Sequence, residues 1–183
     1  MKRLIQKLQR IFTSPIKFAK LLGVKFGKNC YVSTKGFPSE GYLVEIGDCV
    51  RIAHNVTFFT HGGLYGLRKY HNEPDLDQFG KVKVGNYTSI GDNCLIMPGV
   101  KIGERCVIGA GSVVTKSVPD GCVVGGNPAR IIGSSEDFYK RVKEKYDVSS
   151  KGLSSKEKKK YLLSLPEDRF IQKPFMKMPE KDK

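Results

Sequence analysis

Branched aliphatic residues recur at every sixth position between Val84 and Pro119, and this spacing limits the folds open to the chain. The leading residues there are Val84, Ile90, Ile96, Ile102, Ile108 and Val114. A helical face repeats near every 3.6 residues and a half-buried strand at every second residue, so the pattern fits neither. The same rule holds earlier, where Ile46, Ile52 and Phe58 lead successive units. A repeat this regular predicts a solenoid.

Two further positions of each unit indicate how the repeat folds. The second is often glycine and the fifth is short, usually Val, Cys, Thr or Ser. We interpret each unit as a short strand followed by a corner, with the leading aliphatic inward and Gly or Asn relieving a positive φ at the corner. Three units form a triangular coil of about 18 residues, and coils stack at roughly 4.8 Å. The predicted fold is an all-β core, a parallel β-helix of hexapeptide repeats, with N-terminal and C-terminal helices.

The repeats divide the chain into three predicted segments. Residues 1–23 are a basic helix that Pro15 kinks or divides, residues 24–133 are the β-helix domain, and residues 134–183 are a helical, basic extension. A loop at residues 62–81 interrupts the repeats, and loops of this length are usually functional or mobile. The N-terminal helix either caps the first coil or lies on a membrane surface, and the sequence leaves both open.

The net charge of +14 is concentrated at the two ends of the chain. Met1 to Lys28 holds eight Lys or Arg and no acid, and residues 133–183 hold fourteen bases and nine acids. This distribution argues against a nucleic-acid groove in the repeats, and it allows the ends to contact the phosphates of a membrane surface. We find five cysteines without a CxxC pair, no signal peptide, and no apolar run of roughly 20 residues. These features indicate a cytoplasmic protein, with peripheral contact at the inner membrane left open.

Three stretches resemble one known family. They are "NVTFFTHGG", "FGKVKVG" and "GAGSVVTKSVPDGCVVGGNPARII". They are similar to motifs of the hexapeptide-repeat acyltransferases, in the maltose- and galactoside-acetyltransferase-like branch, and most of all to the sugar O-acetyltransferases of bacterial polysaccharide biosynthesis. The resemblance covers residues 24–133. It implies a left-handed β-helix, a homotrimer, acetyl-CoA as donor, a sugar hydroxyl as acceptor, and no metal. Periodicity alone does not give the left hand, because the general crossover rule favours the right.

His61 matches the catalytic base of this family. A hydroxyl is a weak nucleophile, and imidazole is a suitable base because it titrates close to pH 7. The thioester is already activated, so direct transfer requires no acyl-enzyme, and the oxyanion requires a donor such as a backbone N–H. Related sequences often have Asp after this histidine, whereas this chain has Gly62. The sequence therefore does not identify the group that orients His61, and Asp75 and Asp77 of the loop are two candidates.

The resemblance also assigns residues to the two substrates. Coenzyme A is expected in the groove between two β-helices of the trimer, with Lys116 and Arg130 suited to its phosphates. The matching positions are Asp92, through its backbone, Ala110, Thr115, Lys116 and Arg130. In the loop, Tyr65 and Arg68 could stack on and hydrogen-bond to a sugar, or the loop could clasp the next subunit.

Three alternative functions remain open from the sequence. The same base and fold serve N-acetylation of an amino sugar or a nucleotide-linked amino sugar. The γ-class carbonic anhydrases share this kind of fold and bind zinc through three histidines, and this chain has His54, His61 and His71. However, the spacing of these histidines places His71 in the irregular loop. The third alternative is a β-helix that serves as a non-catalytic scaffold.

Overall fold

The computed structural model describes residues 12–176 of the chain. The part of the predicted N-terminal helix at residues 1–11 lies outside the described residues. The chain divides into two compact units, Met1–Glu136 and Asp137–Lys183.

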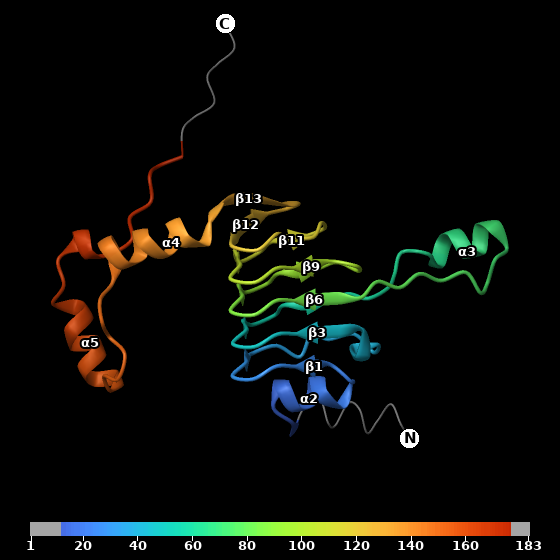
Figure 1. Ribbon diagram of the computed structural model, residues 1–183, viewed down its shortest axis with the longest axis horizontal. Coiled ribbons are helices and arrows are strands. Elements are labelled where there is room, and N and C mark those ends of the chain that lie inside the picture. Colours follow the sequence, from blue (N-terminus) through green and yellow to red (C-terminus); the bar gives the residue numbers. More distant parts are fainter. Residues whose placement is uncertain (1–11, 177–183) are drawn as a thin grey trace, which may run out of the picture. The chain divides into compact units, whose positions relative to one another are not determined.

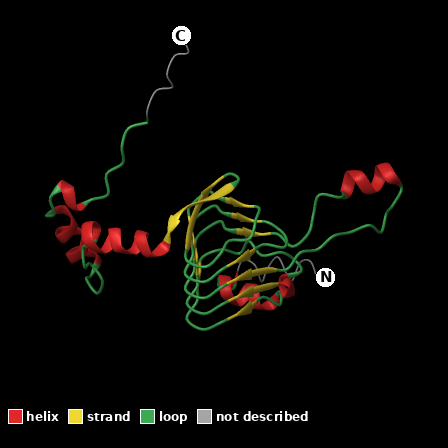
Figure 2. Cartoon of the chain, turned by 45° about the horizontal axis from the view of Figure 1, so that its top comes forward, coloured by secondary structure: helices red, strands yellow, loops and turns green. Residues whose placement is uncertain are grey.

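Short strands of the first unit wind into a coil whose three faces are sheets (Figures 1 and 2). Each parallel pairing joins strands of successive coils, and β12 and β13 form an antiparallel hairpin at one end. This arrangement confirms the predicted parallel β-helix of short strands. The first sheet contains β1 (Lys25–Phe26), β3 (Val44–Ile46), β6 (Val82–Val84) and β9 (Lys101–Ile102). The second contains β2 (Tyr31–Val32), β4 (Arg51–Ile52), β7 (Ser89–Ile90), β10 (Val107–Ile108), β12 (Cys122–Gly126) and β13 (Ala129–Ser134). The third contains β5 (Thr57–Phe58), β8 (Leu95–Ile96) and β11 (Val113–Val114).

The pairing register confirms the length of one coil. Ser89 pairs with Val107, a step of 18 residues. Arg51 pairs with Ser89, a step of 38 residues, because residues 62–81 leave the coil after β5 and return before β6. The loop is therefore a 20-residue insertion into an otherwise regular winding, and the coils on either side of it stack directly.

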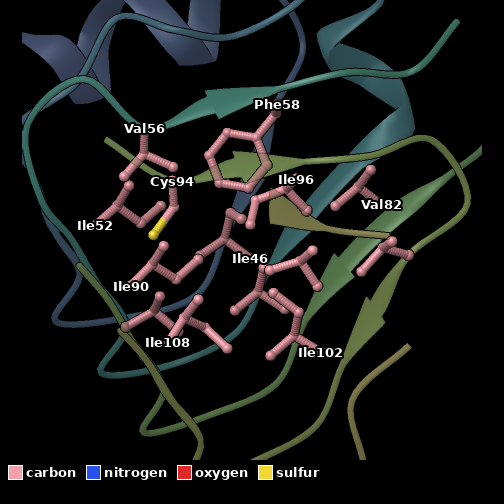
Figure 3. Packing of buried hydrophobic residues seen from close by; sticks show 14 of the residues in the cluster. Ile46, Ile52, Val56, Phe58, Val82, Ile90, Cys94, Ile96, Ile102 and Ile108 are labelled. Atoms are coloured by element: carbon pink, nitrogen blue, oxygen red, sulfur yellow. The ribbon is translucent and has the colours of Figure 1, made fainter. Parts of the chain in front are cut away.

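The core is a column of leading and fifth residues inside the coil (Figure 3). The leading residues from Ile46 to Val114 are all buried, as the repeat predicts. Short polar residues at the fifth position add hydrogen bonds along the column: Thr88 Oγ1 donates to the Gly103 carbonyl (2.8 Å), and Cys94 Sγ to the Gly109 carbonyl (3.1 Å). Burial raises the pKa of the Cys94 thiol, which suits a structural core residue and not a nucleophile.

The role predicted for the second-position glycines is wrong. Positive φ angles occur at the fourth position, where Asn55 has 56° and Asn93 has 59°. Gly91, at a second position, is needed for a different reason: a Cβ there would lie 2.6 Å from the backbone nitrogen of Ala110 on the next coil. The asparagines, together with Gly99 and Gly111 at the same position, thus relieve the corner conformation as expected, whereas second-position glycines such as Gly91 permit close approach of stacked backbones.

Different structures close the two ends of the coil. The helix α2 (Pro15–Leu21) begins at Pro15, and its Phe18 and Ala19 are buried at the first coil, as a cap requires. At the other end, the antiparallel β12–β13 hairpin pairs with β10 through β12. The sequence reading had not anticipated this hairpin, because residues 126–130 interrupt the six-residue rule.

The second unit is helical, with α4 (Ser135–Arg141) leading into it, a π-helical turn η2 (Val142–Tyr146), α5 (Ser155–Leu163) and a short 3-10 helix η3 (Glu167–Arg169). The capping signal at Ser154 and Glu157 is confirmed at the start of α5, where the Ser154 amide donates to the Glu157 carboxylate (2.9 Å). Between residues 12 and 176, no helix combines the length and the apolar character that a membrane crossing requires.

Candidate active site

His61 lies where the regular coil gives way to the inserted loop, which we call the arm (residues 62–81). Its backbone forms an antiparallel bridge with Phe79, and the Gly80 amide donates to the Thr60 carbonyl (2.7 Å). The rings of His61 and Phe79 lie 5.6 Å apart. These contacts close the base of the arm and hold the histidine at the corner after β5, where 42% of its side chain remains exposed.

Glu40 is the partner of His61 that the sequence reading missed. Its Oε2 lies 2.9 Å from His61 Nδ1, and only 21% of its side chain is exposed. The residue belongs to the irregular segment before the 3-10 helix η1 (Gly41–Leu43), and the Gly36–Thr57 bridge brings this segment beside β5. Asp75 and Asp77 do not contact the His61 ring. The sequence did offer one signal: Glu40 is an acid in the segment that interrupts the repeats, about one coil before His61.

The carboxylate of Glu40 is held in its ionised form. Burial raises its pKa, but the hydrogen bond from Ser39, the charge of His61 and the hydrogen bond from Thr60 together lower that pKa below the ordinary glutamate value. An ionised carboxylate at Nδ1 fixes the ring so that Nδ1 carries the proton and Nε2 the lone pair. Within the described part of the chain, no protein group pairs with Nε2. The arrangement can therefore accept a proton from an acidic or hydroxyl group that approaches Nε2.

Four of the five residues predicted to bind coenzyme A lie at the two ends of the strands in the β5–β8–β11 sheet, and the fifth, Arg130, lies in β13 of the second sheet. Asp92 and Ala110 occupy the corner before β8 and β11, with the Gly111 amide donating to the Asp92 carbonyl (2.8 Å). Thr115 and Lys116 follow β11 at the opposite edge, the edge at which His61 follows β5. Two coil steps separate these positions, which is about 10 Å at the strand spacing.

Lys116 and Arg130 line one hollow. It has a volume of about 350 Å³ and its wall also includes Val124 and Ile131. Both basic side chains are exposed, and Arg130 donates to its neighbouring carbonyl at Ala129 (2.9 Å). The structure thus brings together the two cations predicted for the phosphates of the donor, at the end of the coil that the β12–β13 hairpin closes.

The arm carries the two residues predicted for the sugar, but it does not bring them to His61. Tyr65 and Arg68 belong to α3 (Tyr65–His71) and line a separate hollow of about 270 Å³ on the arm. Figure 1 shows α3 projecting from the coil, joined to it by two extended segments of the chain. No hydrogen bond or ring contact of residues 12–176 joins either side chain to the His61 ring.

The three histidines are not brought together within one chain. His54, at the corner before β5, pairs with Asp92 at the corner before β8, and its Nδ1 lies 3.3 Å from that carboxylate. His71 ends α3, with its ring against Tyr70. Among the described residues, no cluster of three or more His, Cys, Asp or Glu side chains could hold a metal ion.

Comparison with known proteins gives one consistent relationship. The family described as Bacterial transferase hexapeptide (six repeats) matches residues 81–116. The chain is 44% identical over 168 residues to Protein CapG of Staphylococcus aureus, which covers 90% of this chain and 95% of that protein. It is 41% identical over 129 residues to Putative acetyltransferase YvoF of Bacillus subtilis (strain 168), covering 69% and 70%. A solved galactoside acetyltransferase in complex with coenzyme A is similar with a TM-score of 0.60 and 31% identity, covering 81% of this chain and 86% of that one.

Proposed function

The chain belongs to the hexapeptide-repeat acetyltransferases, and from this membership we propose that it transfers the acetyl group of acetyl-CoA to a sugar hydroxyl. The donor is supported by the coenzyme A complex of the similar galactoside acetyltransferase, and the acceptor class by that protein's name. We propose cell-surface polysaccharide biosynthesis as the setting, as the resemblance implies.

The observation that carries the proposal is the His61–Glu40 pair at the base of the arm. In the proposed reaction, the acceptor hydroxyl donates its proton to His61 Nε2 while its oxygen bonds to the thioester carbon. The tetrahedral intermediate then collapses, the carbon–sulfur bond breaks, and the imidazolium returns the proton to the departing thiolate. Glu40 stabilises the imidazolium during this sequence, because its carboxylate stays ionised at Nδ1.

The donor is proposed to lie along the β5–β8–β11 sheet with its phosphates at the hollow of Lys116 and Arg130. Two coil steps, about 10 Å, leave room for an extended pantetheine arm between that hollow and His61. Asp92, Ala110 and Thr115 would contribute contacts along the same sheet, as the resemblance implies. No metal enters this scheme.

We also propose that the coil is left-handed and that three copies assemble into a trimer whose grooves hold the donor. The exposed apolar side chains of the arm support assembly, since Tyr70 is 83% exposed and Leu67 and Phe79 are more than half exposed. Light scattering after size exclusion tests the trimer directly. A monomer at micromolar concentration would remove the shared groove and with it the proposed donor site.

The test of the base compares two histidine variants in a free-thiol assay for released coenzyme A. We expect His61→Ala to lower kcat by about 100-fold or more, the usual scale for a general base, with little change in acetyl-CoA affinity. His54→Ala, at the opposite edge of the sheet, should retain turnover. A normal kcat for His61→Ala together with its loss in His54→Ala would assign the base to the other histidine.

The acceptor is identified with the same assay by screening sugars, nucleotide-linked sugars and their amino derivatives. Turnover with hydroxyl acceptors alone supports O-acetylation. Turnover confined to amino sugars would convert the proposal to N-acetylation at the same base.

A further inference from the structure

The helical second unit has an unusual combination of charge and exposed apolar side chains. Residues 137–176 hold eleven Lys or Arg and six Asp or Glu, a net charge of +5. Within the same unit, Leu163 is 77% exposed, Phe175 is 101% exposed and Met176 is 98% exposed. The proposed acetyl transfer uses none of these residues, so this surface requires a separate explanation.

One face of α5 gathers the positive charge. Lys156, Lys159, Lys160 and Leu163 are spaced at i, i+3, i+4 and i+7, so they lie on one side of the helix. All four are exposed, whereas Tyr161 and Leu162 on the other side are half-buried. Between residues 12 and 176, no salt bridge pairs any of the three lysines. We call these four residues the basic face.

The chain that follows η3 adds apolar groups beside basic ones. Ile171, Phe175 and Met176 are exposed in an extended segment that also contains Lys173 and Pro174 (red in Figure 1). Such side chains gain free energy when they leave water, and Lys holds its charge at a headgroup while its stem lies against apolar atoms. A partner that satisfies both features presents negative charge at its surface and hydrocarbon directly beneath.

We propose that the second unit docks on an anionic phospholipid surface, with the basic face on the headgroups and the segment 170–176 inserted between them. Each Lys near an anionic bilayer contributes about 1 kcal/mol, so the three lysines of the basic face give a reversible attachment that salt weakens. This inference is independent of the acetyl transfer, because its residues belong to the second unit and those of the candidate active site belong to the first.

The test is sedimentation of the full-length protein with vesicles of phosphatidylcholine and phosphatidylglycerol at 0.1 M salt. We expect Lys159→Glu, on the basic face, to weaken partitioning about 30-fold, since it removes one attraction and adds a repulsion of about 1 kcal/mol each. Lys158→Glu is the matched control, with the same charge change in the same helix. It lies about 160° round the helix from Lys156, across a diameter close to the Debye length, so its effect should stay below about fivefold.

A second variant tests insertion. The double variant Ile171→Ser with Phe175→Ser should lower partitioning at least about tenfold. Its salt dependence should stay unchanged, because only the transfer of apolar side chains out of water is lost. All variants change exposed residues, and an unchanged coenzyme A release rate verifies that each is folded.

Four outcomes would overturn the proposal. Equal losses for Lys158→Glu and Lys159→Glu would mean that net charge acts without a defined face. Equal binding to pure phosphatidylcholine would exclude the anionic requirement. Loss of binding in Lys17→Glu with Lys20→Glu, but not in Lys159→Glu, would assign the contact to α2. Binding to soluble dextran sulfate without binding to vesicles would make the basic face a site for polyanions and not for lipid.

Discussion

Glu40→Gln isolates the charge that faces His61 while keeping the side chain's size and one acceptor oxygen. Two unit charges 2.9 Å apart attract by about 1.4 kcal/mol in water and by about 6 kcal/mol at the effective dielectric near a protein surface. The His61 side chain is 42% exposed, so solvent screening places the effect toward the lower value. Hydrogen bonds to charged groups contribute about 1.5–3 kcal/mol, which agrees with an estimate of about 2 kcal/mol.

A loss of about 2 kcal/mol from the transition state, where His61 becomes positively charged, corresponds to a fall of about 30-fold in kcat. The free-thiol assay should show this fall with the KM for acetyl-CoA unchanged, because Glu40 lies at the histidine and not at the hollow of Lys116 and Arg130. The matched control is Asp77→Asn, the same chemical change on an arm acid whose carboxylate accepts a hydrogen bond from the Gln78 amide. It should retain kcat within about twofold.

The reasoning fails if Glu40→Gln keeps kcat within threefold of the parent while His61→Ala loses about 100-fold. The base would then act without its carboxylate partner. An equal fall in Asp77→Asn would instead indicate a general effect of net charge around the arm.

The remaining predictions concern the coil, the donor and pH. Gly91→Ala places a Cβ 2.6 Å from the Ala110 nitrogen and should lower the free energy of unfolding by about 3 kcal/mol in urea titrations, whereas Gly66→Ala, in open space on α3, should not lower it. Lys116→Ala and Arg130→Ala should each raise the KM for acetyl-CoA about tenfold with kcat retained, and dephospho-coenzyme A donors should lessen the difference between parent and variants. The folded pKa of Glu40 lies below its unfolded value, so its contribution to stability is complete above about pH 5 and is lost as the pH falls through the folded pKa. Urea titrations at fixed protein concentration should therefore show the parent and Glu40→Gln converging in unfolding free energy below that window, and a constant difference down to pH 3 would contradict the lowered pKa.

The sequence by itself determined the coil. A leading apolar residue and a short fifth residue repeat through nine units, and burial of Ile52, Ile96 and Ile108 follows because only one side chain of each short strand can point inward. The capping pair Ser154 and Glu157 was equally readable, since its hydrogen bonds join residues three apart. In both cases the pattern is local or periodic in the sequence, so the stacking of coils is not needed to predict it.

The role predicted from the sequence for the second-position glycines was wrong, because the contact that requires glycine there joins two successive coils. Positive φ is a property of one residue, whereas the need for Gly91 arises from the Ala110 backbone, 19 residues later, after one coil has been wound. A six-residue pattern shows that glycine is preferred at a position, and only the stacked coils show which atom would collide with a side chain there.

The tertiary structure alone decided how the candidate base is held. Glu40 and His61 are 21 residues apart, and their approach depends on an irregular segment that no repeat rule describes and on the Gly36–Thr57 bridge that aligns it with β5. The arm acids Asp75 and Asp77 lie close in sequence to Phe79, which bridges His61, yet within the described residues the His61 ring forms its ion pair with Glu40 and with neither of them. The sequence was sufficient to predict His61 as the base, because imidazole is the side chain suited to that role. The carboxylate that orients it could be found only where the winding of the chain had brought it.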